Sequence, residues 1–131
     1  MEVAQLKIAR CLILAGSIVL FVNGLAHLIG YSHVTPILVK SGLPPAIASA
    51  IKALWLTYTI HLVLLSIIIV WISRLPRTRP LLFFLALFPL TDALLMFRFI
   101  GPFIGLYGVS VAALLLLIGA WLLPHRDTPA V

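Results

Sequence analysis

Four long apolar stretches dominate this chain, and little sequence is left between them. A helix needs about 20 apolar residues to cross the ~30 Å hydrocarbon core of a bilayer. Hydrophobic residues make up 63% of the 131 residues and charged residues only 9%, so a water-soluble domain of this size would lack the polar surface to cover its core. We therefore expect an all-α, integral membrane four-helix bundle. It should form a single transmembrane domain over residues 1–131, without room for a soluble catalytic domain.

Proline and glycine mark the breaks between the expected helices. Pro44 and Pro45 favour a helix start, and the segment containing Pro36 and Gly42 favours a connection on the outer surface. Pro89 lies inside the third apolar stretch and predicts a kink. The expected helices lie at about 8–30, 45–73, 81–100 and 103–123, with an outer loop at 31–43 and a cytoplasmic loop at 74–80.

The basic residues predict the orientation of the chain. The formal net charge is +6, with nine Lys and Arg against three acids, and most of the basic residues fall at one side of the predicted bundle. The positive-inside rule then places both termini in the cytoplasm, and the charge indicates contact with lipid headgroups rather than with nucleic acid. We expect a multi-pass protein of the cell inner (plasma) membrane. The first apolar run is too long for a typical signal peptide, so we expect it to be retained as a helix.

One imidazole, His61, lies in the middle of the second stretch, and one carboxylate, Asp92, lies in the third. Counting helical rise from the predicted ends places both within about 3 Å of the bilayer midplane. A charged side chain at that depth costs roughly 2.5–3.5 kcal/mol on insertion scales, so each group needs a partner or a purpose. We predict that His61 and Asp92 are a proton-handling, catalytic pair. The alternative is that they only hold the second helix against the third.

Further polar and aromatic residues lie at or outside the midplane, whereas the inner half is almost wholly apolar. This asymmetry predicts a polar cleft that faces outward. The predicted ligand-binding residues of the cleft are Asn23, His27, Lys52, Trp55, Tyr58 and Arg98. The alternatives are an interhelical hydrogen bond for Asn23 and His27, snorkelling to the interface for the two basic residues, and a place in the interfacial aromatic belt for Trp55.

No metal site and no cofactor are predicted. His27 and His61 differ in depth by about 12 Å, too far for both to ligate one haem iron. The chain has no Cys–His cluster, phosphate-binding loop, nucleophile elbow or HExxH motif. Its single cysteine, Cys11, has no second cysteine with which to form an internal disulfide.

Four short helices with few charges, Gly24-x-x-His27 late in the first helix and a glycine-rich last helix resemble the DoxX-like group of small bacterial membrane proteins. The resemblance covers the architecture and implies a four-helix membrane bundle, and no functional residue is carried over. An acid/base cluster enclosed by aromatic residues is also similar in idea to sterol-isomerase membrane bundles. Such an isomerase suggests an acidic pair, whereas Asp92 is the one membrane-embedded acid of this chain.

The leading functional hypothesis is a small membrane protein that binds or transforms a lipophilic molecule with a polar head, of the quinone, isoprenoid or lipid class. A second hypothesis is a non-catalytic accessory or structural subunit, either in a homo-oligomer or in a larger membrane complex. A third is a small proton-coupled transporter, which the apolar inner half argues against. The sequence does not decide whether any reaction is catalysed.

Overall fold

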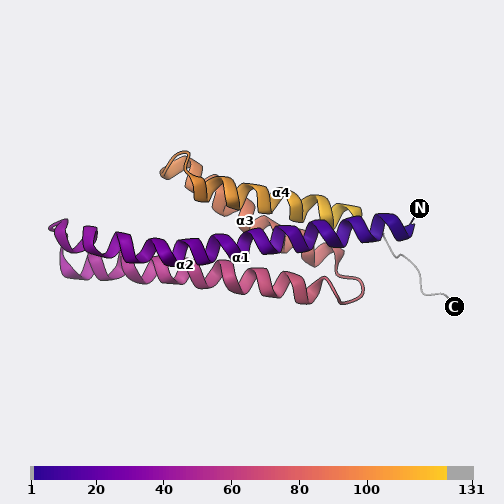
Figure 1. Ribbon diagram of the computed structural model, residues 1–131, viewed down its shortest axis with the longest axis horizontal. Coiled ribbons are helices and arrows are strands. Elements are labelled where there is room, and N and C mark those ends of the chain that lie inside the picture. The colour runs from indigo at the N-terminus through magenta and orange to yellow at the C-terminus, as the bar shows by residue number, and fades with distance from the viewer. Residues whose placement is uncertain (1, 124–131) are drawn as a thin grey trace.

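The computed structural model describes residues 2–123, which fold into four helices connected by short turns (Figure 1). All four helices are long and apolar enough to cross a membrane. The chain is therefore an all-helical, multi-pass membrane protein. The helices are α1 (Glu2–Lys40), α2 (Pro45–Ile72), α3 (Arg79–Phe99) and α4 (Ile104–Leu122).

The last three helices begin and end within two residues of their predicted bounds, but the first helix does not. The prediction of a helix at 8–30 followed by an outer loop at 31–43 was wrong. α1 runs on to Lys40, so the connection to α2 is only 41–44. Gly42, with a φ of 68°, adopts the left-handed conformation that commonly follows the last turn of a helix.

Pro36 is the reason for that error. Proline lacks the N–H that would bond to the carbonyl of Ser32, and on its own it predicts a break. Here the helix continues through it, and two neighbouring hydroxyls bond within the same helix: Ser32 Oγ donates to the Ile29 carbonyl and Thr35 Oγ1 to the Tyr31 carbonyl, at 2.8 and 2.9 Å. This part of α1 lies beside the first turns of α2 (Figure 1), so packing against a neighbouring helix outweighs the local preference.

α1 is the central helix of the bundle. It packs extensively against α2 and against α4, and α3 packs against α4. The spatial order is thus α2, α1, α4, α3. The first and last of these also touch, and theirs is the sparsest contact among the helix pairs that touch. We call the line along which α2 faces α3 the α2–α3 seam.

Close helix packing between α1 and α4 depends on small residues, some of them from the glycine-rich last helix noted in the sequence. A Cβ atom added to Gly119 would lie 2.7 Å from Ile13 Cγ1 and 3.1 Å from the Ala9 carbonyl oxygen. A Cβ atom on Gly16 would lie 2.9 Å from Leu116 Cγ. Glycine therefore lets the two helices approach closely at these points.

The main apolar core lies in the half of the bundle that contains the start of α1 and the end of α4. It draws large buried side chains from all four helices, among them Ile13, Leu65, Ile69, Leu82 and Leu116. A smaller cluster between α3 and α4 lies nearer the opposite end and centres on Leu106 and Val109. The half with the larger core corresponds to the predicted apolar inner half.

The α1–α2 hairpin is longer than the α3–α4 hairpin. α1 has 39 residues and α4 has 19, which correspond to about 58 Å and about 29 Å of helix. The turn between α1 and α2 therefore projects past the turn between α3 and α4 (Figure 1). We call residues 33–52 the hairpin tip. Several of its apolar side chains are exposed, including Ile37 (66%) and Val39 (71%).

Candidate functional site

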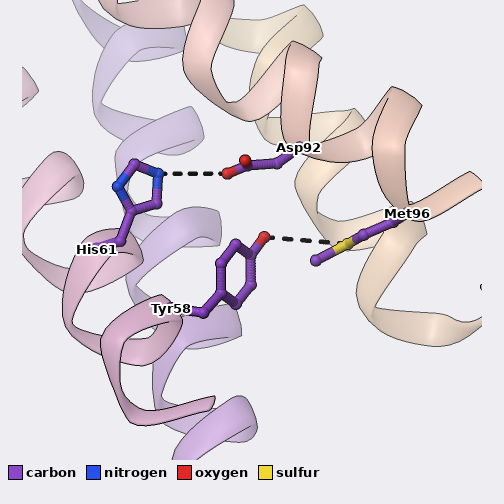
Figure 2. Close-up of polar contacts among 4 residues, drawn as sticks. All are labelled: Tyr58, His61, Asp92 and Met96. Carbon is purple, nitrogen blue, oxygen red and sulfur yellow. Dashed lines mark hydrogen bonds and ion pairs between the residues drawn. The ribbon is translucent and has the colours of Figure 1, made fainter. Parts of the chain in front are cut away.

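His61 on α2 and Asp92 on α3 face each other across the α2–α3 seam (Figure 2). His61 Nε2 lies 3.3 Å from Asp92 Oδ2, and the two side chains are 34% and 21% exposed. Both atoms are buried, and neither has a hydrogen-bond partner among the described residues. The contact is within ion-pair distance but lacks the alignment of a hydrogen bond, so both atoms retain unused hydrogen-bonding capacity.

Helical spacing on α3 places a row of side chains along the seam. Phe88, Asp92 and Met96 follow one another at intervals of four residues, so they share one face of the helix. Pro89, which is fully buried beside this row, lies inside the helix and removes one backbone donor. Pro89 therefore leaves the carbonyl of Leu85 without its usual helical donor, close to the face that holds the carboxylate.

Tyr58 lies one helical turn before His61 on the same face of α2. Its hydroxyl points toward α3 and donates to the Met96 sulfur at 3.9 Å (Figure 2). The tyrosine ring is 6.1 Å from the His61 ring, which is in turn 6.1 Å from the Phe88 ring. The ion pair is thus flanked by an aromatic residue on each helix, and this combination suits a ligand with a polar group on an apolar body.

His27 on α1 belongs to a second, adjoining cluster. Its Nδ1 lies 2.9 Å from Thr59 Oγ1, and the Thr59 hydroxyl donates its proton to the Trp55 carbonyl at 3.1 Å. A hydroxyl has one proton to donate, so His27 Nδ1 carries the hydrogen of the contact and Nε2 keeps its lone pair. Trp55 Nε1 donates to the His27 carbonyl at 2.7 Å, and the two rings stack at 4.2 Å.

The two clusters meet at Tyr58. Its ring contacts the edge of the His27 ring at a centroid distance of 5.0 Å and also neighbours His61. The predicted residues His27, Trp55 and Tyr58 therefore lie in one continuous row with His61, although the first two are mainly engaged in joining α1 to α2.

The other three predicted ligand-binding residues lie apart from this row. Asn23 Nδ2 donates to the Gly105 carbonyl at 3.1 Å, so its side chain faces α4. Arg98 is exposed in the last turn of α3, with its guanidinium carbon 5.6 Å from the centre of the Phe99 ring. Lys52 is half-buried on α2, nine residues before His61.

Phe88, Met96 and Thr59 were not predicted as parts of the site. The spacing of Phe88 and Met96 around Asp92 was readable from the sequence. Thr59 is two residues from His61, so helical spacing places it on the opposite face of α2, where it contacts α1. The sequence did not show that His27 would meet it there.

An imidazole and a carboxylate at this distance can share or exchange one proton, and each can bond to a polar ligand group placed beside them. Within residues 3–123 there is no group of three or more His, Cys, Asp or Glu side chains placed to hold one metal ion. The chemistry that the described residues offer at the seam is therefore proton transfer and hydrogen bonding.

Comparison of the chain with protein-family models, with curated proteins and with solved structures finds no match.

Proposed function

We propose that the α2–α3 seam binds a lipophilic molecule of the quinone, isoprenoid or lipid class, with its polar head at His61 and Asp92. The observation that carries the proposal is the pair itself. Two buried polar atoms lie 3.3 Å apart without another partner among the described residues, on the two helices whose mutual contact is the sparsest in the bundle.

The energetics favour a ligand that bonds to these two groups. A buried polar atom without a partner costs about 1–3 kcal/mol, and more if it is charged. A ligand carbonyl or hydroxyl can accept a hydrogen bond from the imidazole N–H, and a ligand hydroxyl can also donate one to the carboxylate. Such a bond would satisfy groups that the protein leaves unsatisfied.

The position of the pair favours a ligand that arrives through the bilayer. Both side chains are partly exposed on a helix face, and Tyr58 and Phe88 border them with aromatic rings. The main apolar core lies below the pair, toward the end of the bundle that holds Arg10 and Arg74. In the proposal this end faces the cytoplasm, and the seam opens toward the opposite side.

In this proposal the pair handles protons as well as binding. Movement of one proton between Asp92, His61 and the ligand head would activate a carbonyl or hydroxyl at the seam. The apolar core supports binding or local chemistry more than conduction, because a proton path through the bundle would need polar groups on that side of the pair as well.

The test compares Asp92→Asn and His61→Gln with a control, Ser110→Ala, in nanodiscs. Ser110 bonds only to the Leu106 carbonyl of its own helix and is not part of the seam. Binding of a short-chain prenyl quinone and of a prenyl alcohol is titrated, and native mass spectrometry examines molecules that co-purify. We expect both seam variants to weaken binding roughly tenfold or more, which corresponds to one lost charge-assisted bond.

The control should bind as the parent protein does, and circular dichroism should show that all three variants stay helical. Unchanged binding in both seam variants would mean that His61 and Asp92 serve only to position the two helices.

A second candidate function is an accessory subunit of a larger membrane complex. The observation that favours it is the hairpin tip, which projects past the α3–α4 turn with exposed apolar side chains such as Ile37 and Val39. Native mass spectrometry from a mild detergent distinguishes the two candidates. A stable protein partner released by Ile37→Asn would favour the subunit role, whereas a bound small molecule in a partner-free protein would favour the seam.

A further inference from the structure

A separate pocket lies between α1 and α2 at the end of the bundle where α1 begins. Its volume is about 320 Å³, and it is lined by Arg10 and Leu14 from α1 and by Val70, Ser73 and Arg74 from the last turn of α2 and the residues just after it. Arg74 is 13 residues from His61, which corresponds to about 20 Å along a helix. The pocket is therefore distinct from the α2–α3 seam.

Two arginines line this pocket, and none of its described lining residues is a carboxylate that would balance them. The chain has only three acids against nine Lys and Arg, and Asp92 is engaged with His61. Within residues 3–123, His61–Asp92 is the one ion pair closer than 4.0 Å. Guanidinium groups bind phosphate through two parallel N–H bonds, so two of them at one pocket favour a phosphate anion.

The remaining lining residues point to an amphiphile. On α1, Leu14 lies one turn from Arg10 toward the centre of the bundle. On α2, Val70 lies four residues before Arg74, which follows the end of the helix, so it too is nearer the centre of the bundle than its arginine. Free phosphate would use only the two arginines. A phospholipid would place its phosphate on them and the start of an acyl chain on Leu14 and Val70.

Ser73 adds an acceptor beside the phosphate position. Its hydroxyl donates to the Val70 carbonyl at 2.8 Å, so its oxygen can accept a bond from a ligand but has no further proton to donate. The glycerol headgroup of phosphatidylglycerol carries hydroxyls that can donate to such an acceptor.

We propose that this pocket binds the phosphate headgroup of an anionic phospholipid, held by Arg10 and Arg74 with an acyl chain over Leu14 and Val70. The site is independent of the seam, and its occupancy requires neither His61 nor Asp92.

The experiment measures retained lipid by native mass spectrometry after exchange into micelles doped with dioleoyl phosphatidylglycerol or dioleoyl phosphatidylcholine. The variants are Arg10→Gln and Arg74→Gln. The control is Arg77→Gln, which removes the same charge from the exposed loop at the same end without lining the pocket. We expect the parent protein to prefer phosphatidylglycerol, and each pocket variant to weaken its retention roughly fivefold or more.

Lipid retention by the control should stay within about twofold of the parent value. The Arg77 charge lies on the exposed loop outside the pocket, so salt screens its attraction for the lipid phosphate. An equal loss in Arg77→Gln would overturn the proposal, since the attraction would then be general to the basic end. Equal retention of the two lipids by the parent protein would overturn it as well.

A second arm separates lipid from free phosphate. Leu14→Asn should weaken retention of phosphatidylglycerol, and millimolar inorganic phosphate or glycerol 3-phosphate should not displace the lipid from the parent protein. Displacement by either, together with full retention by Leu14→Asn, would show that the pocket recognises a soluble phosphate and would overturn the lipid assignment. Circular dichroism and gel filtration check that each variant is folded.

Discussion

At the scale of single residues, the chain contains one imidazole and one carboxylate that meet in the middle of an apolar bundle. Counting helical rise predicted their common depth, and the 3.3 Å contact agrees with it. The same counting could not assign partners to Asn23 and His27. The two are one turn apart on α1, which has a helix on either side, so a small difference in angle sends one to α4 and the other to α2.

Replacing only one member of the ion pair should lower the free energy of unfolding more than replacing both does. We expect His61→Leu or Asp92→Leu to lower the free energy of unfolding by about 1–3 kcal/mol, because each leaves a buried polar partner behind. The double variant should lose less than the sum of the two. Denaturant unfolding in mixed micelles measures the cycle, and strictly additive losses would show that the two side chains do not interact.

Thr59→Val should weaken the contact between α1 and α2. The substitution keeps the shape of the side chain but removes the oxygen that receives the His27 Nδ1–H bond, and we expect a loss of about 1 kcal/mol in unfolding free energy. Ser110→Ala, which removes only a bond within α4, serves as the reference and should cost less. Equal losses would mean that the His27 contact adds nothing to stability.

At the scale of the helices, length and hydropathy were enough to predict four spans, and proline at the start of α2 was a reliable signal. Pro36 was misleading because local preference was weighed without the neighbouring helix that covers it. The glycine-rich sequence of α4 suits close helix packing, but its partner, α1, became apparent only from the structure.

Gly119→Val should force α1 and α4 apart. Because a Cβ atom at this position would lie 2.7 Å from Ile13 Cγ1 and 3.1 Å from a backbone oxygen, the side chain cannot fit without a backbone shift. We expect a loss of about 1–3 kcal/mol in unfolding free energy, as for other overpacked cores. Ala26→Val places the same valine side chain at an exposed position of α1 and should be nearly neutral. Similar stability of the two variants would contradict the tight contact.

At the scale of the whole molecule, the order α2, α1, α4, α3 was not predictable. An apolar helix surface packs equally well against lipid and against another helix, so the sequence contained no strong signal for which pairs would touch. α2 has polar residues on two opposite faces, Tyr58 and His61 on one and Trp55 and Thr59 on the other, and it has a neighbour on each side, one packed closely and the other sparsely.

Four spans place the start of α1 and the hairpin tip on opposite sides of the membrane, and the basic end should be cytoplasmic. In a Cys11→Ser background, we expect a membrane-impermeant maleimide to label Val39→Cys in intact cells. Val3→Cys should be labelled only after permeabilisation. Both positions are exposed in the structure. Labelling of Val3→Cys alone in intact cells would show the opposite orientation.

The sparse packing between α2 and α3 has a mechanical consequence. α3 is held to the rest of the bundle chiefly through α4, and α2 chiefly through α1. The α1–α2 and α3–α4 hairpins can therefore separate most easily along the α2–α3 seam, by pivoting about the α1–α4 contact. A ligand that enters laterally from the bilayer would need to open only the α2–α3 seam, the most weakly packed contact between helices. It could reach the imidazole and the carboxylate while the glycine-lined surface behind them stayed closed.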